Sequence, residues 1–455
     1  MISSTSDIYS VGIATVDITP PVGTPLAGFG DRSIHSSTAV YHPLRAVAVV
    51  VDDGETPMLL LSAEWIAFSG MSERVRGRLA EVTGLPTSSI ILSATHTHCG
   101  PVMKPRDVVT HGRVDNAYLD HAVERMAHAA EMAWKHRIAA RLRSGVGHCS
   151  LAMYRRVPDP ANPGRVLRAM RPNPDGPTDH EVGIVTIESL DGIVRGILFN
   201  YACHPTSRNG LMIGGDYVGF AYDYLQEAFP YAQPCFVQGC GGDQKPRPAD
   251  SKGNTFGLRK VEQVREIGFE LGQAVEQAIA NDSLDTVTGA IAVKQAMVEL
   301  ETEPLDRSLV KSELTNDARP TKQRWARYHQ ERIEQGLPEE RAVPFEVQTL
   351  RFGKSLAMAT FAGEMSVEHG LRLKRDLRPY FKHVIPMAYT NELVGYVASK
   401  DQFAEYGYEV LDANQNRKRT GRFVEETEDR IHDVCARQLL GKTLPVASAM
   451  EAATS

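Results

Sequence analysis

Short apolar runs alternate with stretches of helical periodicity, and this alternation limits the fold of the 455-residue chain more than any other feature. The runs are rich in Val, Ile and Leu, and several show no polar alternation, as is typical of strands covered on both faces. They lie at residues 45–52, 57–65, 89–95, 183–189, 196–202 and 234–239. Amphipathic helices are expected at 116–135, 258–280 and about 423–440. Such interleaving predicts a layered α/β fold.

One large domain is expected, because the chain has no internal repeat and no low-complexity linker. Two segments show neither the strand pattern nor the helical periodicity. Residues 154–182 hold six prolines and five arginines, and loops this long within a domain are usually functional or disordered. Residues 304–342 are highly charged and predict a solvated helix or an excursion from the domain.

Charge and cysteine content exclude several classes of function. A net charge of -6 gives no basic surface for nucleic acid. No apolar run approaches the roughly 20 residues that a membrane span needs, and the N-terminus has no pattern of a secretory signal. The six cysteines include no CxxC pair, so we expect reduced thiols and a cytoplasmic location. No oligomeric state is predicted.

Histidines follow two of the expected strands. His96 and His98 stand in ATHTHCGP, and side chains two residues apart on a strand point the same way. His204 follows another strand in NYACHPTS. Open α/β sheets place their sites at strand ends, so the three imidazoles are expected to meet if their strands are neighbours in one sheet. Metal binding and acid/base catalysis both explain such a group.

Acidic residues beside glycines are candidates to join these histidines. Asp216 in GGDYVG lies in a turn before a helical stretch. Glu364 follows the strand-like LAMATFAG, where it is either a metal ligand or a helix N-terminal acid stabilised by the macrodipole. Three glycines precede Asp243 in QGCGGDQK, which predicts a close backbone approach to a ligand or a simple turn. The sequence has no GxGxxG, P-loop, GxSxG or HExxH pattern.

Taken together and in order, these motifs resemble a known family. They are VGIATVDITPPVGTPLAGFGDR, ATHTHCGP, NYACHPTS, GGDYVGFA, FVQGCGGDQKPR, FAGE and GYVASKDQFAEYGYE. Their order is similar to that in the catalytic domain of the neutral (non-lysosomal) ceramidases, over residues from about 10 to 440. The resemblance implies a single layered hydrolase domain over residues 1–445, with a mixed β-sheet flanked by helices, and a disordered tail at 446–455.

The resemblance also implies a metal site. In the family two histidines, a glutamate and a tyrosine hold one Zn²⁺, and manganese or iron would tolerate a similar set. The matching residues here are His96, His204, Glu364 and Tyr396. His98 would lie beside the metal as a substrate contact or proton-transfer group. Tyr408 matches a second tyrosine that the family places near the substrate.

The chain departs from the family at one catalytic motif. Ceramidases carry a serine in GDxSPN, whereas GDQKPR places Lys245 at that serine and Arg247 at the asparagine. Together with Asp243, Lys245 is a catalytic candidate that would orient an anionic substrate group or stabilise an oxyanion; the alternative is a lysine that points to solvent. Asp216 and Arg247 are candidate substrate contacts.

Arg155 and Arg156 open the arginine-rich stretch, for which two interpretations remain. The stretch is either a flap whose guanidinium groups bind a carboxylate or phosphate, or a solvated loop. In the second case its arginines would pair with the acids of the same loop, Asp159, Asp175, Asp179 and Glu181.

The predicted function is zinc-dependent hydrolysis of an amide bond in a small, polar, anionic N-acyl substrate. Ceramide itself is not expected, because the sequence shows neither the serine motif nor the immunoglobulin-like C-terminal domain nor an export signal. The alternatives are a lactone or ester hydrolase, a metal-dependent isomerase or lyase, and a non-catalytic ligand-binding homologue.

Overall fold

A mixed sheet organises most of the chain, for which the computed structural model describes residues 7–29, 35–103, 114–249, 253–316 and 320–444. Its strands follow the order β11-β9-β8-β6-β1-β3-β4-β5, and β13 pairs with β6. The pairs β4–β5 and β9–β11 are parallel. The nine strands are β1 (Tyr9–Asp17), β3 (Arg45–Asp52), β4 (Met58–Ala63), β5 (Ile90–Ala94), β6 (Ile138–His148), β8 (Glu181–Ser189), β9 (Val194–Tyr201), β11 (Gln233–Gln238) and β13 (Asp285–Thr286).

A second sheet of four strands packs against the first. Its order is β14-β15-β16-β18, and three two-stranded pairs (β2–β10, β7–β12 and β17–β19) lie beside the two sheets. The four strands are β14 (Ile291–Glu301), β15 (Ala342–Phe352), β16 (Leu356–Phe361) and β18 (His383–Met387). The paired short strands are β2 (Ala39–Val40), β7 (Ala152–Tyr154), β10 (Met212–Ile213), β12 (Gln244–Pro246), β17 (Glu364–Met365) and β19 (Tyr396–Val397).

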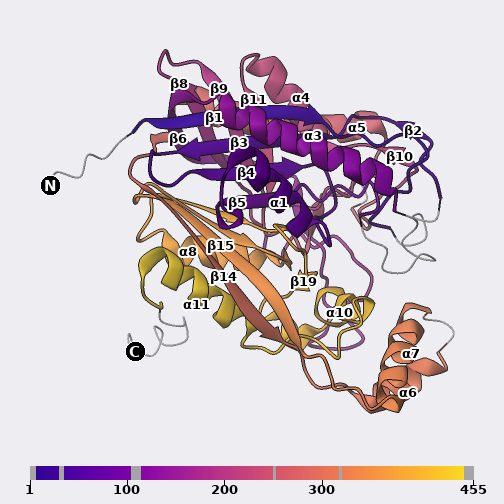
Figure 1. Ribbon diagram of the computed structural model, residues 1–455. Coiled ribbons are helices and arrows are strands. Elements are labelled where there is room, and N and C mark those ends of the chain that lie inside the picture. Colours follow the sequence, from indigo (N-terminus) through magenta and orange to yellow (C-terminus); the bar gives the residue numbers. More distant parts are fainter. Residues whose placement is uncertain (1–6, 30–34, 104–113, 250–252, 317–319, 445–455) are drawn as a thin grey trace.

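Helices cover the outer face of each sheet. Those on the larger sheet are α1 (Ser72–Thr83), α3 (Asn116–Lys135), α4 (Asp216–Ala228) and α5 (Val261–Ala280). Those on the smaller sheet are α8 (Val367–Leu377) and α11 (Thr427–Leu440), at the lower left of Figure 1. The short helical turns are η1 (Thr87–Ser89), α9 (Gln402–Glu405), the π-helix η2 (Tyr408–Asp412) and α10 (Ala413–Asn416).

The alternation of side chains along β3 shows how the layers form. Ala46, Ala48 and Val50 pack under the helices α1 and α3, while Val47 and Val49 pack toward the smaller sheet. Successive side chains of a strand point to opposite faces, so a strand without polar residues needs a layer on each side. The covered faces predicted from the sequence are confirmed, with helices on one side and a second sheet on the other.

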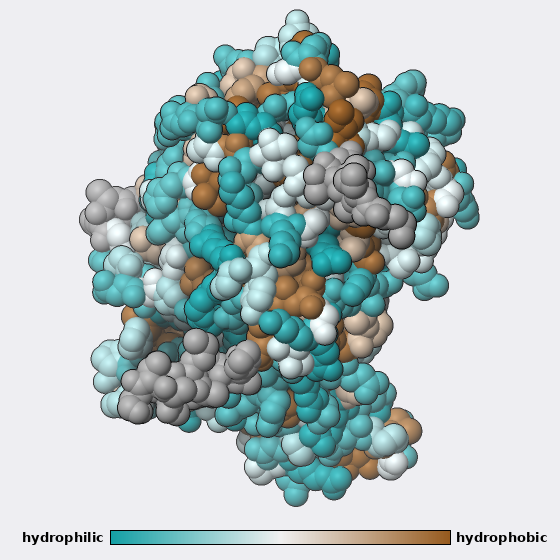
Figure 2. All heavy atoms as spheres, turned by 90° about the vertical axis from the view of Figure 1, so that its left-hand side faces the viewer, coloured by the Kyte–Doolittle hydropathy of each residue, from teal (hydrophilic) through white to brown (hydrophobic). Residues whose placement is uncertain are grey.

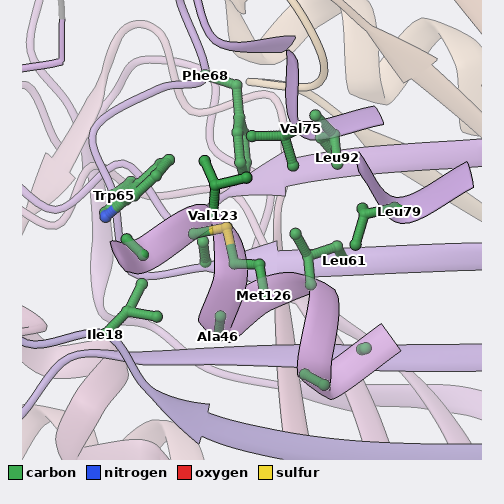
Figure 3. Close-up of a cluster of buried hydrophobic side chains, with 14 of the residues drawn as sticks. Ile18, Ala46, Leu61, Trp65, Phe68, Val75, Leu79, Leu92, Val123 and Met126 are labelled. Carbon is green, nitrogen blue, oxygen red and sulfur yellow. The ribbon is translucent and has the colours of Figure 1, made fainter. Parts of the chain in front are cut away.

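A cluster of large side chains fixes the segment that follows β4. Trp65 and Phe68 are fully buried and lie beside Val123 and Met126 of α3 (Figure 3). The indole nitrogen of Trp65 donates to the hydroxyl of Tyr118 at 2.9 Å, so the ring is fixed by a hydrogen bond as well as by packing. The carbonyl of Ile66, between these two anchors, is thereby held in one place.

The two ends of the larger sheet meet. The hydroxyl of Ser62 in β4 donates to the carbonyl of Phe236 in β11. The segment after β18 bridges the same gap, because the N–H of Ala388 donates to Gln238 and the carbonyl of Tyr389 accepts from Ala94. The ends of β5 and β11 are therefore brought together although they lie at opposite ends of the strand order.

The predicted layered domain with a mixed sheet and flanking helices is confirmed. The strand predicted at 45–52 coincides with β3, and the helix predicted at 116–135 coincides with α3. The charged segment 304–342 forms two helices, α6 (Arg307–Leu314) and α7 (Pro320–Glu334), which project from the body at the lower right of Figure 1. The predicted tail at 446–455 lies outside the described residues.

The surface is largely polar on the side shown in Figure 2, where hydrophobic residues lie in small, separate patches. Among the described residues, no helix combines the length and the apolar character that crossing a bilayer requires.

A buried ion pair joins α1 to the smaller sheet, and we expect its loss to be costly. Arg76 donates to both carboxylate oxygens of Glu346, at 2.5 and 3.0 Å, and to Gln348 at 2.8 Å. Arg76→Ala would leave a buried carboxylate unpaired and should lower the free energy of unfolding by about 3–5 kcal/mol in urea titrations. Arg78→Ala, which breaks an exposed pair on the same helix, should change it little; equal losses would contradict this account.

Two stacked histidines between α8 and α11 should make the stability depend on pH. Burial lowers the pKa of His369 and lowers that of His432 well below its usual value, with Arg372 and Arg375 acting in the same direction on His432 and Glu428 acting against. The unfolded chain binds these protons near pH 6.5, so the free energy of unfolding should fall as the pH drops below that value.

The measurement is urea unfolding of metal-free protein at about pH 7.5 and about pH 5.5. The loss of stability between the two should be smaller in His432→Gln, whose amide still donates toward His369. An unchanged pH dependence in that variant would exclude the pair as its source.

Candidate functional site

The predicted histidines meet where the two ends of the larger sheet come together. His96 follows β5 and His204 follows β9, and their ring centroids lie 5.0 Å apart. The prediction required the strands before these histidines to be neighbours in the sheet. β5 and β9 are not neighbours, so this requirement is not met. The histidines converge because the sheet curls until its two ends touch.

His96 is held by the segment anchored by Trp65 and Phe68. Its N–H donates to the carbonyl of Trp65 at 2.9 Å, and its Nδ1 donates to the carbonyl of Ile66 at 2.6 Å. The Nδ1 proton is thus fixed, and Nε2 keeps a lone pair. The backbone of His96 has φ 69°, a left-handed conformation that is strained for a non-glycine residue and that the surrounding bonds maintain.

His204 is oriented in the same way by a different loop. Its Nδ1 lies 2.6 Å from the carbonyl of Gly241 and 3.1 Å from that of Gln244, so it also donates to the backbone. Burial lowers the pKa of His204 to about 4, although the neighbouring Glu364 acts in the opposite direction. The ring is neutral at pH 7 and presents the lone pair of Nε2.

Glu364 and Tyr396 complete the group from the short β17–β19 pair, in which they stand directly opposite each other. Oε2 of Glu364 lies 3.4 Å from Nε2 of His96 and 3.5 Å from Nε2 of His204. The hydroxyl of Tyr396 lies 3.2 Å from Nε2 of His204. Glu364 is therefore a strand residue, and helix α8 begins only at Val367, so the helix N-terminal interpretation is wrong.

The charges favour a cation at the centre of this group. Burial opposes ionisation of Glu364, but the adjacent imidazoles of His96 and His204 lower its pKa well below the usual value. Burial and the charge of Glu364 raise the pKa of Tyr396 well above its usual value. A metal ion would satisfy the carboxylate, both imidazole lone pairs and the phenol oxygen together.

The spacing of these donors fits a tetrahedral metal. Ligands about 2.0–2.2 Å from a tetrahedral ion lie about 3.3–3.6 Å from one another. The three separations involving Glu364 and Tyr396 lie at 3.2–3.5 Å. His98 forms a second possible donor set with His96 and His204, since the three present nitrogens within 4.8 Å of one another.

The glycines before Asp243 allow close contact between this turn and the backbone segments that carry the donor residues. A Cβ on Gly241 would lie 2.9 Å from the nitrogen of Cys203, and a Cβ on Gly242 would lie 2.7 Å from the carbonyl of Glu364. The close approach predicted for this turn is therefore an approach to the two segments that carry His204 and Glu364. Larger residues would separate those segments.

A cavity of about 210 Å³ opens above the histidines. His98 faces it, with Nε2 3.1 Å from Nε2 of His96. Gly28 lies against the His98 ring, where a Cβ would come within 2.5 Å of it. The described lining also includes Ala27, Phe29, Ile66, Ala67, Ser69, Val102, Met103, Leu393, Tyr408, Ala413, Asn416 and Arg417.

Two predicted acids hold the loops that carry the donors, and neither is in the described lining. Asp216 accepts from the N–H of Ser207 at 2.9 Å, just after His204. Asp243 accepts from the N–H of Val367 at 2.9 Å and from Gln402 at 2.7 Å. Lys245 also lies outside the described lining, with its ammonium over the Phe256 ring, and burial together with Arg155 lowers its pKa to about 8.

The predicted arginines bind the chain's own carboxylates. Arg155 donates to Glu409 at 2.9 Å, and Arg156 donates to Glu409 at 2.6 Å and to Glu405 at 3.0 Å. Arg247 pairs with Glu270 at 2.6 Å. The carboxylate partners of Arg155 and Arg156 are Glu405 and Glu409, so the alternative pairing with acids of the same loop is wrong for these two arginines.

Two polar residues of the cavity lining, Asn416 and Arg417, were not predicted from the sequence. Asn416 and Arg417 lie in NQNRKRTGR, a basic run that is typical of a solvated surface. Only the spatial neighbourhood of Glu364, 3.8 Å from Nη2 of Arg417, distinguishes this arginine from the others in the run.

Solved structures share this arrangement of layers. One, described as a ceramidase complexed with C2, has a TM-score of 0.72 at 15% identity, covering 97% of this chain and 77% of that one. A neutral ceramidase from Pseudomonas aeruginosa has a TM-score of 0.71 at 16% identity, covering 98% and 77%. The chain has the fold of the neutral ceramidases. No family model matches the sequence.

The donor set found on this ceramidase fold predicts about one divalent metal per chain, measured by mass spectrometry on untagged protein. His204→Ala should lose almost all of it, because the variant removes one ligand and the hydrogen bond that orients it. The exposed helical residue His128 gives the control, and His128→Ala should keep the full content. Equal metal in both variants would rule out His204 as a ligand.

Proposed function

We propose that this chain is a zinc-dependent hydrolase that cleaves the amide bond of a small N-acyl substrate. The observation that carries the proposal is the convergence of donor atoms from His96, His204, Glu364 and Tyr396 beneath an open cavity, with three of their separations at 3.2–3.5 Å. Mixed imidazole and carboxylate donors suit zinc. The fold shared with the ceramidases supports the same reaction class.

His96, His204, Glu364 and Tyr396 would hold the zinc, which would supply an acidic water and polarise a carbonyl. His98 is the proton-transfer group of the proposal, because its ring lines the cavity and is not needed for the four-donor set. It would carry a proton to the leaving amine through Nε2.

Tyr408 is the proposed oxyanion donor. Its ring lies 5.3 Å from that of Tyr396, on the wall of the cavity. Burial, and then the charge of Glu364, raise its pKa, so the hydroxyl keeps its proton at neutral pH and can donate to the oxygen on which charge develops.

The dimensions favour a small substrate. The cavity volume of about 210 Å³ lies below the range of about 300–1,000 Å³ common for ligand pockets. Its apolar lining suits a short acyl chain. The six cysteines are free and buried, in keeping with a reducing compartment, and we propose a cytoplasmic location.

The test is release of a primary amine by zinc-loaded protein from water-soluble N-acyl compounds and, separately, from long-chain ceramide in detergent. We expect the soluble compounds to be turned over faster. Lactone or ester opening releases no amine, and an isomerase gives an isomer of its substrate, so product analysis separates these alternatives.

His98→Ala should lower kcat by about 10²–10⁴-fold while the zinc content stays unchanged, because His98 transfers a proton and does not hold the metal. His128→Ala is the matched control and should behave as wild type. Faster turnover of ceramide than of every soluble substrate would refute the small-substrate part of the proposal, and full activity in His98→Ala would refute its role.

A further inference from the structure

Tyr389 is a fully buried residue that packs against the donor group without belonging to the described cavity lining. Its ring centroid lies 4.3 Å from that of His96, with an angle of 40° between the two planes. The same ring lies 5.9 Å from that of His204, at an angle of 87°. Tyr389 therefore lies partly over the first imidazole and meets the second edge to face.

The backbone of Tyr389 connects the segments that carry two of the donors. Its N–H donates to the carbonyl of Gly363, directly before Glu364, at 3.0 Å. Its carbonyl accepts from the N–H of Ala94, two residues before His96, at 3.1 Å. One residue thus joins the Glu364 and His96 segments while its ring contacts both imidazoles.

The backbone conformation of Tyr389 is one that an aromatic residue seldom adopts. Its φ is 57°, in the left-handed region, where a residue with a Cβ is strained. Such strain persists only where the surrounding structure maintains it, and it is concentrated at functional sites. Here the two backbone hydrogen bonds maintain the strained conformation and thereby hold the ring against the imidazoles.

The hydroxyl of Tyr389 does not explain why the ring occupies this position. It is buried and makes no hydrogen bond with any described residue. A buried hydroxyl without a partner lowers the stability of a fold. The similarly buried Tyr9, by contrast, donates to the carbonyl of Gly289 at 2.7 Å. The contribution of Tyr389 must therefore come from its ring.

The imidazoles need support beyond their own hydrogen bonds. Hydrogen bonds from Nδ1 to backbone carbonyls hold the rings of His96 and His204. Such a bond fixes the tautomer and the direction of Nδ1, but the ring can still turn about the line of the bond. A flat aromatic ring packed against the imidazole removes this freedom. Binding of a metal then requires less ordering of its ligands.

We infer that Tyr389 is a positioning residue of the metal site, which aligns the imidazoles of His96 and His204 through the packing of its ring. The inference rests on the proposed metal site and is independent of the reaction. It adds to the four-donor set a residue that holds the donors without binding the metal.

Metal affinity tests the inference. Dissociation constants for Zn²⁺ and Co²⁺ are measured by competition with a chelator, and the visible absorption of cobalt-loaded protein reports the geometry of the donors. Tyr389→Leu removes the flat ring and should weaken binding about 10–100-fold, the range found when groups that orient metal ligands are removed. Its cobalt spectrum should differ from that of wild type even at saturating metal.

Tyr389→Phe is the conservative variant. It keeps the ring, so its affinity and its cobalt spectrum should match those of wild type. Its midpoint of thermal unfolding should be no lower than that of wild type, because the variant loses only a hydroxyl that has no partner among the described residues.

Tyr9→Leu is the matched control, because Tyr9 is similarly buried but packs against Phe352 of the smaller sheet. It should lower the midpoint of thermal unfolding of the metal-free protein and leave the metal affinity and the cobalt spectrum unchanged. Circular dichroism checks that each variant is folded. Tyr389→Met, which fills more of the space than leucine without a flat ring, takes the place of Tyr389→Leu if the latter does not fold.

Wild-type affinity in Tyr389→Leu would overturn the inference. Equal losses in Tyr389→Phe and Tyr389→Leu would also overturn it, since they would assign the effect to the hydroxyl. An equal loss in Tyr9→Leu would show that general destabilisation is the cause. Wild-type protein that binds neither zinc nor cobalt would refute the proposed metal site itself, which is a different result from each of these.

Discussion

The closure of the larger sheet on itself is the contact on which the site depends. The Ser62–Phe236 hydrogen bond and the bridging segment at Ala388 and Tyr389 join strand ends that are distant in the strand order. In an open sheet of this strand order, β5 and β9 would lie far apart, and His96 and His204 would not meet. The smaller sheet supplies the bridge, because residues 388–391 continue directly from β18. The packing of the two sheets therefore also brings the donor residues together.

Backbone carbonyls, rather than carboxylates, orient the two imidazoles. Ile66 accepts from His96, and Gly241 accepts from His204. A carbonyl fixes the tautomer without adding a negative charge, so Glu364 keeps its role as the acidic donor. Both carbonyl-bearing loops must be held in fixed positions. The buried Trp65 fixes the loop that carries Ile66, and Gly242 allows the loop that carries Gly241 to approach Glu364 closely.

The sequence predicted the parts of the fold that local pattern controls. The bounds of β3 and α3 were predicted to the residue. The spacing of apolar residues along each segment indicates which of its faces are buried. The presence of a second sheet between the helix layers was not predicted, since a strand buried under a sheet and one buried under a helix have the same composition. His96, His98 and His204 were found because strand ends carry sites.

Residues whose roles depend on tertiary contacts were harder to assign. Arg155 and Arg156 resemble substrate-binding residues in sequence, yet each is bound to Glu409, more than 250 residues away. Arg417 is the opposite case. It lies in a basic run that is typical of a solvated surface, but its side chain lines the cavity. The sign of a charge is visible in sequence, whereas its partner is determined by the fold.

The floor and the walls of the cavity have different structural origins, and this difference governs what the fold can imply about the substrate. The donors on the floor come from strand ends and the β17–β19 pair, whose positions follow from the sheet closure. The walls come from residues 27–29, 66–69 and 413–417, which lie outside the strands of both sheets. The position of the donor set thus follows from the fold of this chain, while the substrate must be argued from the residues that form the cavity walls.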